Sequence, residues 1–421
     1  MNRTSDTSIA NNPWQEREAL PPVSPIHKIL AAVAVFLSAL GLPVCLWNGL
    51  SAALSEGLGI LLLLLLCVYT FKTARSTPTL PLLFCTAFGL TFVVGLSFTG
   101  GAVVLAVIVS LAAGSFLTTV TGRPYLTLLC HAAAFAIAFA ITRDPIGSLL
   151  TLTTLPAALL AAFATLKDMG RTRVVCYATG GLLFAAAAMI AFHLFYADVA
   201  FEREAIFLYV DSLRTSLFDA AVAIRDESIA TLKGAQTGAA ADQLIEQFQM
   251  LYSDEMLRTT VTQLFNLLPA LLTVFCLGLA YEANSLLLTL HASAGLGAVN
   301  TGTARRIIVG APASVVFILA FLLMMLLPEG EIASAVVQNL ALILLPGLAL
   351  FGGQRLMLVL FRLQGMMRFL LAFAVLALLF CNLGGALYIL ALWGAYSSIG
   401  DLLRAILIER IKRNGGNGTQ P

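Results

Sequence analysis

Charged residues are few in this chain, and their positions constrain its fold more than any other feature. Of the 421 residues, 11% are charged and 59% are hydrophobic, and the charged residues lie almost entirely between long apolar runs. A soluble chain of this length would need far more charge on its surface. Apolar runs of about 20 residues match the thickness of a bilayer. In lipid they must be helical, because every backbone amide needs an internal partner. The sequence therefore predicts an all-α, polytopic transmembrane helical bundle.

Twelve apolar segments are candidates for membrane spans. They are residues 29–47, 52–71, 80–96, 102–120, 125–141, 146–166, 174–195, 264–281, 307–327, 332–351, 369–381 and 383–399. The eleventh is short for a span of about 20 residues, so it either begins near Met366 or is partly re-entrant. With the N-terminus in the cytoplasm, 18 of the 24 Lys and Arg residues fall on the cytoplasmic side. Because basic residues prefer that side, we expect twelve spans in a bacterial inner membrane, with both termini cytoplasmic.

One polar stretch, Asp198 to Arg258, holds half of the 22 acidic residues and only five basic ones. Apolar residues recur in it at intervals of three and four, at Ile206, Val210, Leu213, Leu217, Ala221 and Ile224. This spacing predicts an amphipathic helix. A break around Gly234 and Gly238 then precedes a second helix marked by Leu244, Phe248 and Leu251. We expect an extracytoplasmic amphipathic helical hairpin, which either packs on the bundle or acts as a lid or docking arm.

These features divide the chain into five predicted regions. They are a cytosolic tail at residues 1–28, a seven-span bundle at 29–196, the acidic hairpin at 197–258, a five-span bundle at 259–400 and a basic cytosolic tail at 401–421.

Ionisable and amide side chains at membrane depth are costly, so each is a candidate for function. The candidate cavity or substrate groups are Glu56, His131, Glu282, Asn284, Gln338, Asn339, Gln354 and Arg355. Each has a plainer interpretation as well. Glu56 could cap or extend to the interface, His131 could be a hydrogen-bonded packing residue, and the amides could join helices through hydrogen bonds. Both interpretations remain open at the sequence level.

Common catalytic and ligand-binding motifs are missing from the sequence. It contains no HExxH, no GxSxG and no phosphate-binding loop. The seven cysteines have neither CxxC nor Cys/His spacing, which argues against disulfides and metal sites. No basic patch with interleaved aromatic residues indicates nucleic-acid binding. We therefore expect no enzyme activity, no cofactor, no metal and no nucleic-acid partner.

From about Gln243 onward, motifs occur in an order that resembles a known family. The acidic helix Gln243–Glu255 precedes a span that opens at Leu267-Leu-Pro, followed by Gly295, Pro312, Gln338-Asn-Leu and a glycine-rich exit at Gly352-Gly353. The chain closes with Gly394, Gly400, Asp401 and Arg404. This arrangement is similar to the YybS-like family of bacterial membrane proteins, a domain of unknown function. The resemblance implies that Asp401 and Arg404 form the family's C-terminal pair. It also implies a distant similarity to the S components of energy-coupling-factor importers.

Two functions follow as hypotheses. The first is a solute-binding or transport-type membrane component with an intramembrane cavity, whose partners are the lipid bilayer and a small-molecule solute. The second is a non-catalytic membrane scaffold or assembly factor, which binds another envelope protein through the hairpin and the cytosolic tail.

Overall fold

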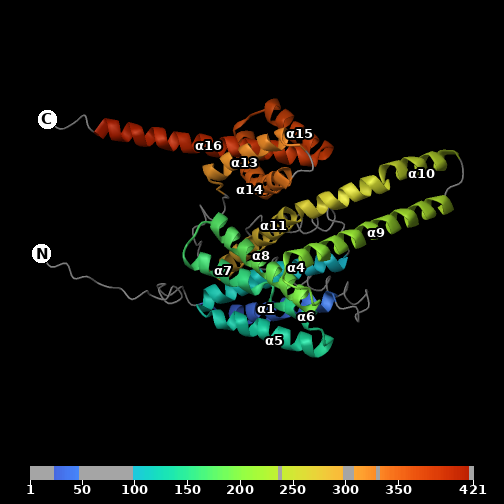
Figure 1. Cartoon of the computed structure of the whole chain (residues 1–421). Helices are drawn as coiled ribbons and strands as arrows, with labels where there is room; N and C mark the ends of the chain where they lie inside the picture. The colour runs from blue at the N-terminus through green and yellow to red at the C-terminus, as the bar shows by residue number, and fades with distance from the viewer. Residues whose placement is uncertain (1–22, 47–97, 236–238, 297–307, 329–331, 417–421) are drawn as a thin grey trace. The chain divides into compact units, whose positions relative to one another are not determined.

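The computed structural model describes residues 23–46, 98–235, 239–296, 308–328 and 332–416 (Figure 1). Across these residues the chain forms helices and turns without any strand. Eight helical segments of the described chain are long and apolar enough to cross a membrane, and one of them, Pro145–Leu166, combines α6, η1 and α7. Their length and composition define a multi-pass, all-helical membrane protein. The predicted spans at 52–71 and 80–96 lie outside the described residues, as does Glu56.

The described residues divide into two compact units. The first lies within Met1–Ile190 and Thr273–Val309, and the second within Ala191–Leu272 and Gly310–Pro421. The first unit contains α1 (Pro25–Leu46), α4 (Phe98–Thr121), α5 (Pro124–Thr142), α6 (Pro145–Leu149), the 3-10 turn η1 (Leu150–Leu152), α7 (Leu155–Leu166) and most of α8 (Arg171–Tyr196). It also takes the second half of α11 (Asp254–Ser293).

Helix α4 is the central helix of the first unit. In the most apolar stretch of α4, 78% of the residues are buried, compared with 22% in α5 and 39% in α8. Small residues permit this burial: Ala106, Ala112 and Ala113 are almost inaccessible, and Gly114 lies against Ala158 of α7. Lipid tails are as apolar as these side chains, so close backbone approach provides the packing that holds membrane helices together.

The sixth predicted span, residues 146–166, is interrupted in the structure. It forms α6, η1 and α7 rather than one helix. Asp144 caps α6, since its carboxylate accepts the backbone N–H groups of Ile146 and Gly147 at 3.0 Å each. Pro156 lies in the first turn of α7, where a missing N–H is tolerated. Hydropathy alone hides this break, because apolar residues continue through it.

The second unit contains α9 (Arg203–Ala235), α10 (Ala239–Leu251), the first half of α11, α13 (Ala311–Leu326), α14 (Ile332–Arg362), α15 (Met366–Cys381) and α16 (Leu383–Gly416). Helices α13 and α15 are each shorter than 18 residues. Helices α14 and α16 cross at two glycines. A Cβ atom on Gly352 would meet the carbonyl oxygen of Leu390, and one on Gly394 would meet that of Leu348. Neither glycine can become alanine without a backbone shift.

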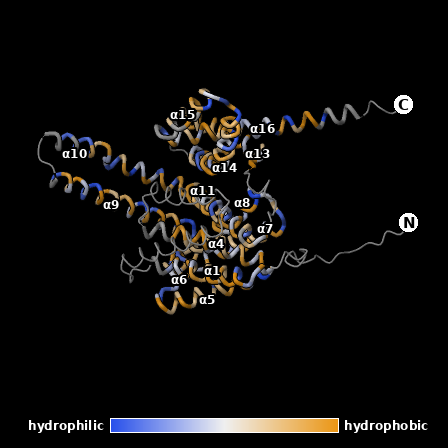
Figure 2. Tube along the Cα trace, turned by 180° about the vertical axis from the view of Figure 1, so that it is seen from behind, coloured by the Kyte–Doolittle hydropathy of each residue, from blue (hydrophilic) through white to orange (hydrophobic). Residues whose placement is uncertain are grey.

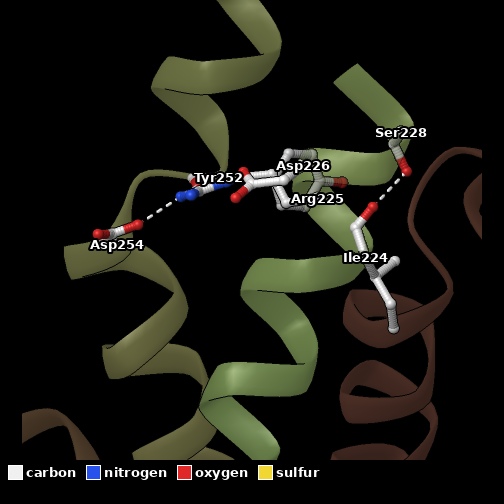
Figure 3. Close-up of polar contacts among 6 residues, drawn as sticks. All are labelled: Ile224, Arg225, Asp226, Ser228, Tyr252 and Asp254. Carbon is white, nitrogen blue, oxygen red and sulfur yellow. Dashed lines mark hydrogen bonds and ion pairs between the residues drawn. The ribbon is translucent and has the colours of Figure 1, made fainter. Parts of the chain in front are cut away.

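Helices α9 and α10 occupy the predicted amphipathic stretch. Helix α9 ends at Ala235 and α10 begins at Ala239, around the predicted glycine break. Hydrophilic and hydrophobic residues alternate along both helices in Figure 2. Within the second unit, Arg225 of α9 holds the α10–α11 junction. Its Nη1 donates to the carbonyl of Tyr252 at 3.0 Å and to the carboxylate of Asp254 at 2.5 Å (Figure 3).

Candidate functional site

The first polar cluster of the first unit surrounds His131 in the middle of α5. The imidazole is fully buried. Its Nδ1 lies 2.8 Å from the carbonyl oxygen of Thr127, and its Nε2 lies 3.1 Å from the hydroxyl of Thr154 and 3.3 Å from that of Ser110. The two hydroxyls are 2.7 Å apart. The ring of His131 therefore bonds to α4 through Ser110, to its own helix α5 through Thr127, and to Thr154, the residue before α7.

These contacts determine the tautomer of His131. A carbonyl oxygen can only accept, so Nδ1 carries the proton and donates to Thr127. In the neutral ring Nε2 then accepts a hydroxyl hydrogen from Thr154 or Ser110. Both hydroxyls can be satisfied at the same time, because one donates to the ring and the other donates to its neighbour. The hydrogen bonds around the ring thus suit a neutral imidazole with hydroxyl partners.

Helix α4 carries further buried hydroxyls next to this cluster. Thr118 bonds to the hydroxyl of Thr127 at 2.8 Å, and Ser115 donates to the carbonyl of Ala158 at 3.0 Å. Thr127 also donates to the carbonyl of Gly114. These bonds link α4 to α5 and α7 in an apolar environment, where an unsatisfied polar group would be costly.

A second polar cluster lies along Tyr281–His291, in the part of α11 that belongs to the first unit. Five polar side chains here are at most 9% exposed: Glu282, Asn284, Ser285, Thr289 and His291. Buried apolar residues, among them Leu286 and Leu287, separate them. A helix buried on every side is normally apolar. Ionisable groups in such a position are expensive and mark a functional candidate.

Arg171, the first residue of α8, contacts this segment directly. Its Nη2 donates to the hydroxyl of Ser285 at 2.6 Å, and its guanidinium carbon lies 4.4 Å from the centre of the Tyr281 ring. The distance to the ring is within the range of a cation–π contact. Arg171 therefore brings a guanidinium group to the segment of α11 that contains the buried Glu282.

The other end of the segment contacts α4. Nε2 of His291 lies 2.9 Å from the hydroxyl of Thr119, and its ring is 5.4 Å from that of Phe116. Asn284 lies on the same face of α11 as His291, seven residues earlier. Its Oδ1 is buried and has no hydrogen-bond partner within the part of the chain that the structure describes. The segment thus offers an amide, a carboxyl group and an imidazole within three helical turns.

The other predicted site residues that the structure describes lie in the second unit. The Asn339 amide joins helices: its Nδ2 donates to the carbonyl of Asn266 at 2.7 Å, and its Oδ1 accepts the N–H of Ala270 at 3.0 Å. Gln338 bonds to Ser334 in its own helix, and Gln354 is half-buried on α14. The structure therefore brings His131, Glu282 and Asn284 into one unit, and it places the predicted amides of α14 in the other.

The predicted C-terminal pair has a different geometry. Asp401 of α16 forms an ion pair with Arg355 of α14, another predicted site residue. Arg404 is exposed on α16. Both members of the ion pair are partly exposed, at 37% and 46%. The pair lies seven residues beyond the Gly394 crossing and extends the contact between α14 and α16.

Sequence reasoning predicted only His131, Glu282 and Asn284 of these clusters and missed their other polar members, among them Ser110, Thr154, Arg171 and His291. Serine and threonine are common in membrane spans, so Ser110 and Thr154 did not stand out in the sequence. Arg171 was assigned to a cytoplasmic loop. His291 carried the one available signal, since it follows Glu282 and Asn284 in a run that continues the eighth span.

The described residues contain no group of three His, Cys, Asp or Glu side chains that could hold a metal ion. Three described cysteines, Cys130, Cys176 and Cys276, are free thiols. Comparisons of the chain with protein-family models, with curated proteins and with solved structures gave no match. The site itself must therefore carry the functional argument.

Proposed function

We propose that this chain is a solute-binding or transport-type component of a bacterial inner membrane. The observation that carries the proposal is the buried polar segment Tyr281–His291 of α11 with Arg171 against it. This part of α11 carries the carboxyl group of Glu282 and an amide oxygen of Asn284 that has no hydrogen-bond partner among the described residues, and Arg171 of α8 bonds to the segment. Packing alone would make such a helix apolar. Polar groups buried at membrane depth in transporters mark substrate and ion pathways.

The His131 cluster adds a second argument for this function. Residues 145–166 form an interrupted helix, and Thr154 at the interruption bonds to the buried imidazole. In transporters, interrupted helices with polar partners recur at solute sites. The cluster supplies both hydrogen-bond donors and acceptors, so we expect a polar solute rather than an apolar one.

The test is a ligand screen of the full chain in detergent, followed by thermal unfolding. Vitamins, nucleosides and inorganic ions are the probes, because a ligand that binds only the folded state must raise its stability. A ligand that shifts the wild type should bind Glu282→Gln about tenfold more weakly, equivalent to roughly 1.4 kcal/mol. His193→Gln is the matched control, since His193 is exposed and bonds to the hydroxyl of Tyr209 rather than to any residue of the two clusters. Equal binding of the ligand by both variants would show that Glu282 is not part of the binding site.

The proposed topology has twelve spans, both termini in the cytoplasm and the α9–α10 hairpin outside. Its support is the distribution of Lys and Arg, which favours the cytoplasmic side. Single cysteines in a cysteine-free chain test it with a membrane-impermeant thiol reagent on intact cells. A cysteine at Asp198 should react, and one at Arg123 should react only after the membrane is opened. The reverse labelling would overturn the orientation.

Membership of the YybS-like family, with Asp401 and Arg404 as its C-terminal pair, remains part of this proposal.

A scaffold or assembly function is the second candidate, and the hairpin favours it. Helix α9 is 33 residues long, is not among the membrane-length apolar helices, and is tied to the α10–α11 junction by Arg225. Its predicted partner is another envelope protein. Deletion of residues 200–255 should abolish a complex that co-purifies with the wild type. A complex that survives the deletion would exclude the hairpin as its binding site.

A further inference from the structure

Asn284 differs from other buried polar residues of α11 in how its side chain is bonded. Ser285 and Thr289 donate to backbone carbonyls one turn earlier, at 3.1 and 3.0 Å. His291 bonds to the hydroxyl of Thr119 on α4. The side chain of Asn284 is 5% exposed, and its Oδ1 has no hydrogen-bond partner within the described part of the chain. A buried acceptor without a partner costs the protein its full desolvation energy.

The neighbours of Asn284 on its own helix face cannot replace the missing partner. These neighbours are Ala280, one turn earlier, and Leu287, one turn later, and they are 0% and 1% exposed. Their side chains carry no polar atom. A buried water needs two to four polar partners, and a water at Asn284 would find no second one on these two side chains. The oxygen therefore suits a ligand that brings its own donor.

We propose that Asn284 Oδ1 accepts a hydrogen bond from the solute, so the solute belongs to the class that presents an N–H or O–H group to this oxygen. The inference rests on the proposed function, because it concerns the same segment of α11. An amide oxygen accepts and cannot donate. A site built to bond a donor rejects an analogue that lacks the donor, because the buried polar group of the site is then left unpaired.

This assignment makes a prediction about stability in the absence of solute. Replacing a buried acceptor that has no partner with an apolar side chain removes a desolvation cost and can stabilise the protein. Residues kept for binding often lower stability in this way. A structural asparagine behaves in the opposite way. Asn339 of α14 is one, since its amide donates to the carbonyls of Asn266 and Ala335 and accepts the N–H of Ala270.

The first measurement is thermal unfolding of the full-length protein in detergent without added solute. Asn284→Leu should raise the unfolding midpoint by about 2 °C. The matched control Asn339→Leu should lower it, because three hydrogen bonds are lost. Asn284→Val has a smaller side chain than leucine, so it separates loss of the amide from a steric clash. A midpoint that is unchanged or lowered in both Asn284 variants overturns the inference.

The second measurement uses the vitamins and nucleosides of the ligand screen that carry an N–H group. Each is tested beside a derivative methylated at that nitrogen, such as nicotinamide beside N,N-dimethylnicotinamide. A probe that stabilises the wild type should bind Asn284→Leu about tenfold more weakly, and its methylated derivative should bind both proteins equally weakly. Equal binding of that probe by the wild type and Asn284→Leu refutes the inference and leaves the proposed function standing. If none of the probes stabilises the wild type, the proposed function fails and the inference fails with it.

Discussion

The Nε2 atom of His131 lies 3.1 Å from the hydroxyl of Thr154, so the middle of α5 is bonded to the interruption between η1 and α7. Both side chains are fully buried. The hydrogen bond joins an ionisable ring to the one part of the segment 145–166 whose backbone leaves the regular helix. The interruption and the buried histidine are therefore one structural feature.

Thr154→Val should destabilise the protein by about 0.5–1.5 kcal/mol, the net contribution of a typical hydrogen bond, because the Ser110 hydroxyl remains within reach of the His131 ring. The change removes one hydroxyl bonded to His131 and to Ser110. Thr153→Val is the control, because Thr153 donates only to the carbonyl of Leu150. Reversible unfolding in mixed micelles measures both. A smaller effect in combination with His131→Phe than in the wild type would show that the two residues are coupled; equal effects would show that they are independent.

Gly352→Ala should weaken the contact between α14 and α16 by about 1–3 kcal/mol, as expected for an added methyl group in a filled contact. The new Cβ would meet the backbone carbonyl of Leu390, which cannot rotate away as a side chain could. Gly353→Ala is the matched control, since no atom lies within 4 Å of its added Cβ. It should be neutral or more stable by up to about 1 kcal/mol, because alanine favours the helix. Equal destabilisation by both changes would contradict the close approach of α14 and α16 at Gly352.

Gly181→Ala tests the first unit in the same way. Its Cβ would meet the backbone of Ala157 and Pro156 at the start of α7, whereas Gly180 has open space. We expect a loss of about 1–3 kcal/mol for Gly181→Ala and little change for Gly180→Ala. Thermal unfolding of the two purified variants makes the comparison. Stability equal to the wild type for Gly181→Ala would show that α7 and α8 are further apart.

The sequence predicted the positions of helices far better than the contacts between them. Helix α14 begins at the predicted residue, Ile332, because apolar runs and polar loops are local properties. The break before α7 was missed because apolar side chains continue through residues 145–166 and only the backbone changes. The partners of Asp401 and Asn339 were also missed. They lie 46 and 69 or more residues away, where one sequence holds no record of spatial proximity.

The Arg355–Asp401 ion pair predicts a charge-swap result. Arg355→Asp and Asp401→Arg should each destabilise the protein, and the double variant should recover most of the loss. Each single change should lower the free energy of unfolding by no more than about 1 kcal/mol, because both side chains are partly exposed and screened by solvent. The effect should shrink as salt is added. Arg404→Asp is the control and should be close to neutral. Failure of the double variant to recover would show that the pair contributes nothing to the α14–α16 contact.

Arg225→Ala should release α9 from the α10–α11 junction and speed limited proteolysis of the hairpin. The guanidinium bonds to Asp254, to Asp226 and to the carbonyl of Tyr252, so its loss leaves the junction without its cation (Figure 3). These bonds, that to Asp254 first, raise the pKa of Arg225 above its ordinary value. A raised pKa means that the stabilisation is complete below the ordinary pKa of arginine and is lost only as pH rises through the higher value. The difference in cleavage rate between wild type and Arg225→Ala should therefore be the same at pH 7 and pH 9.

Arg214→Ala is the control, since Arg214 pairs with Asp211 within α9. Cleavage of the Arg214 variant as fast as that of the Arg225 variant would show that helix α9 itself, rather than its junction, had been weakened.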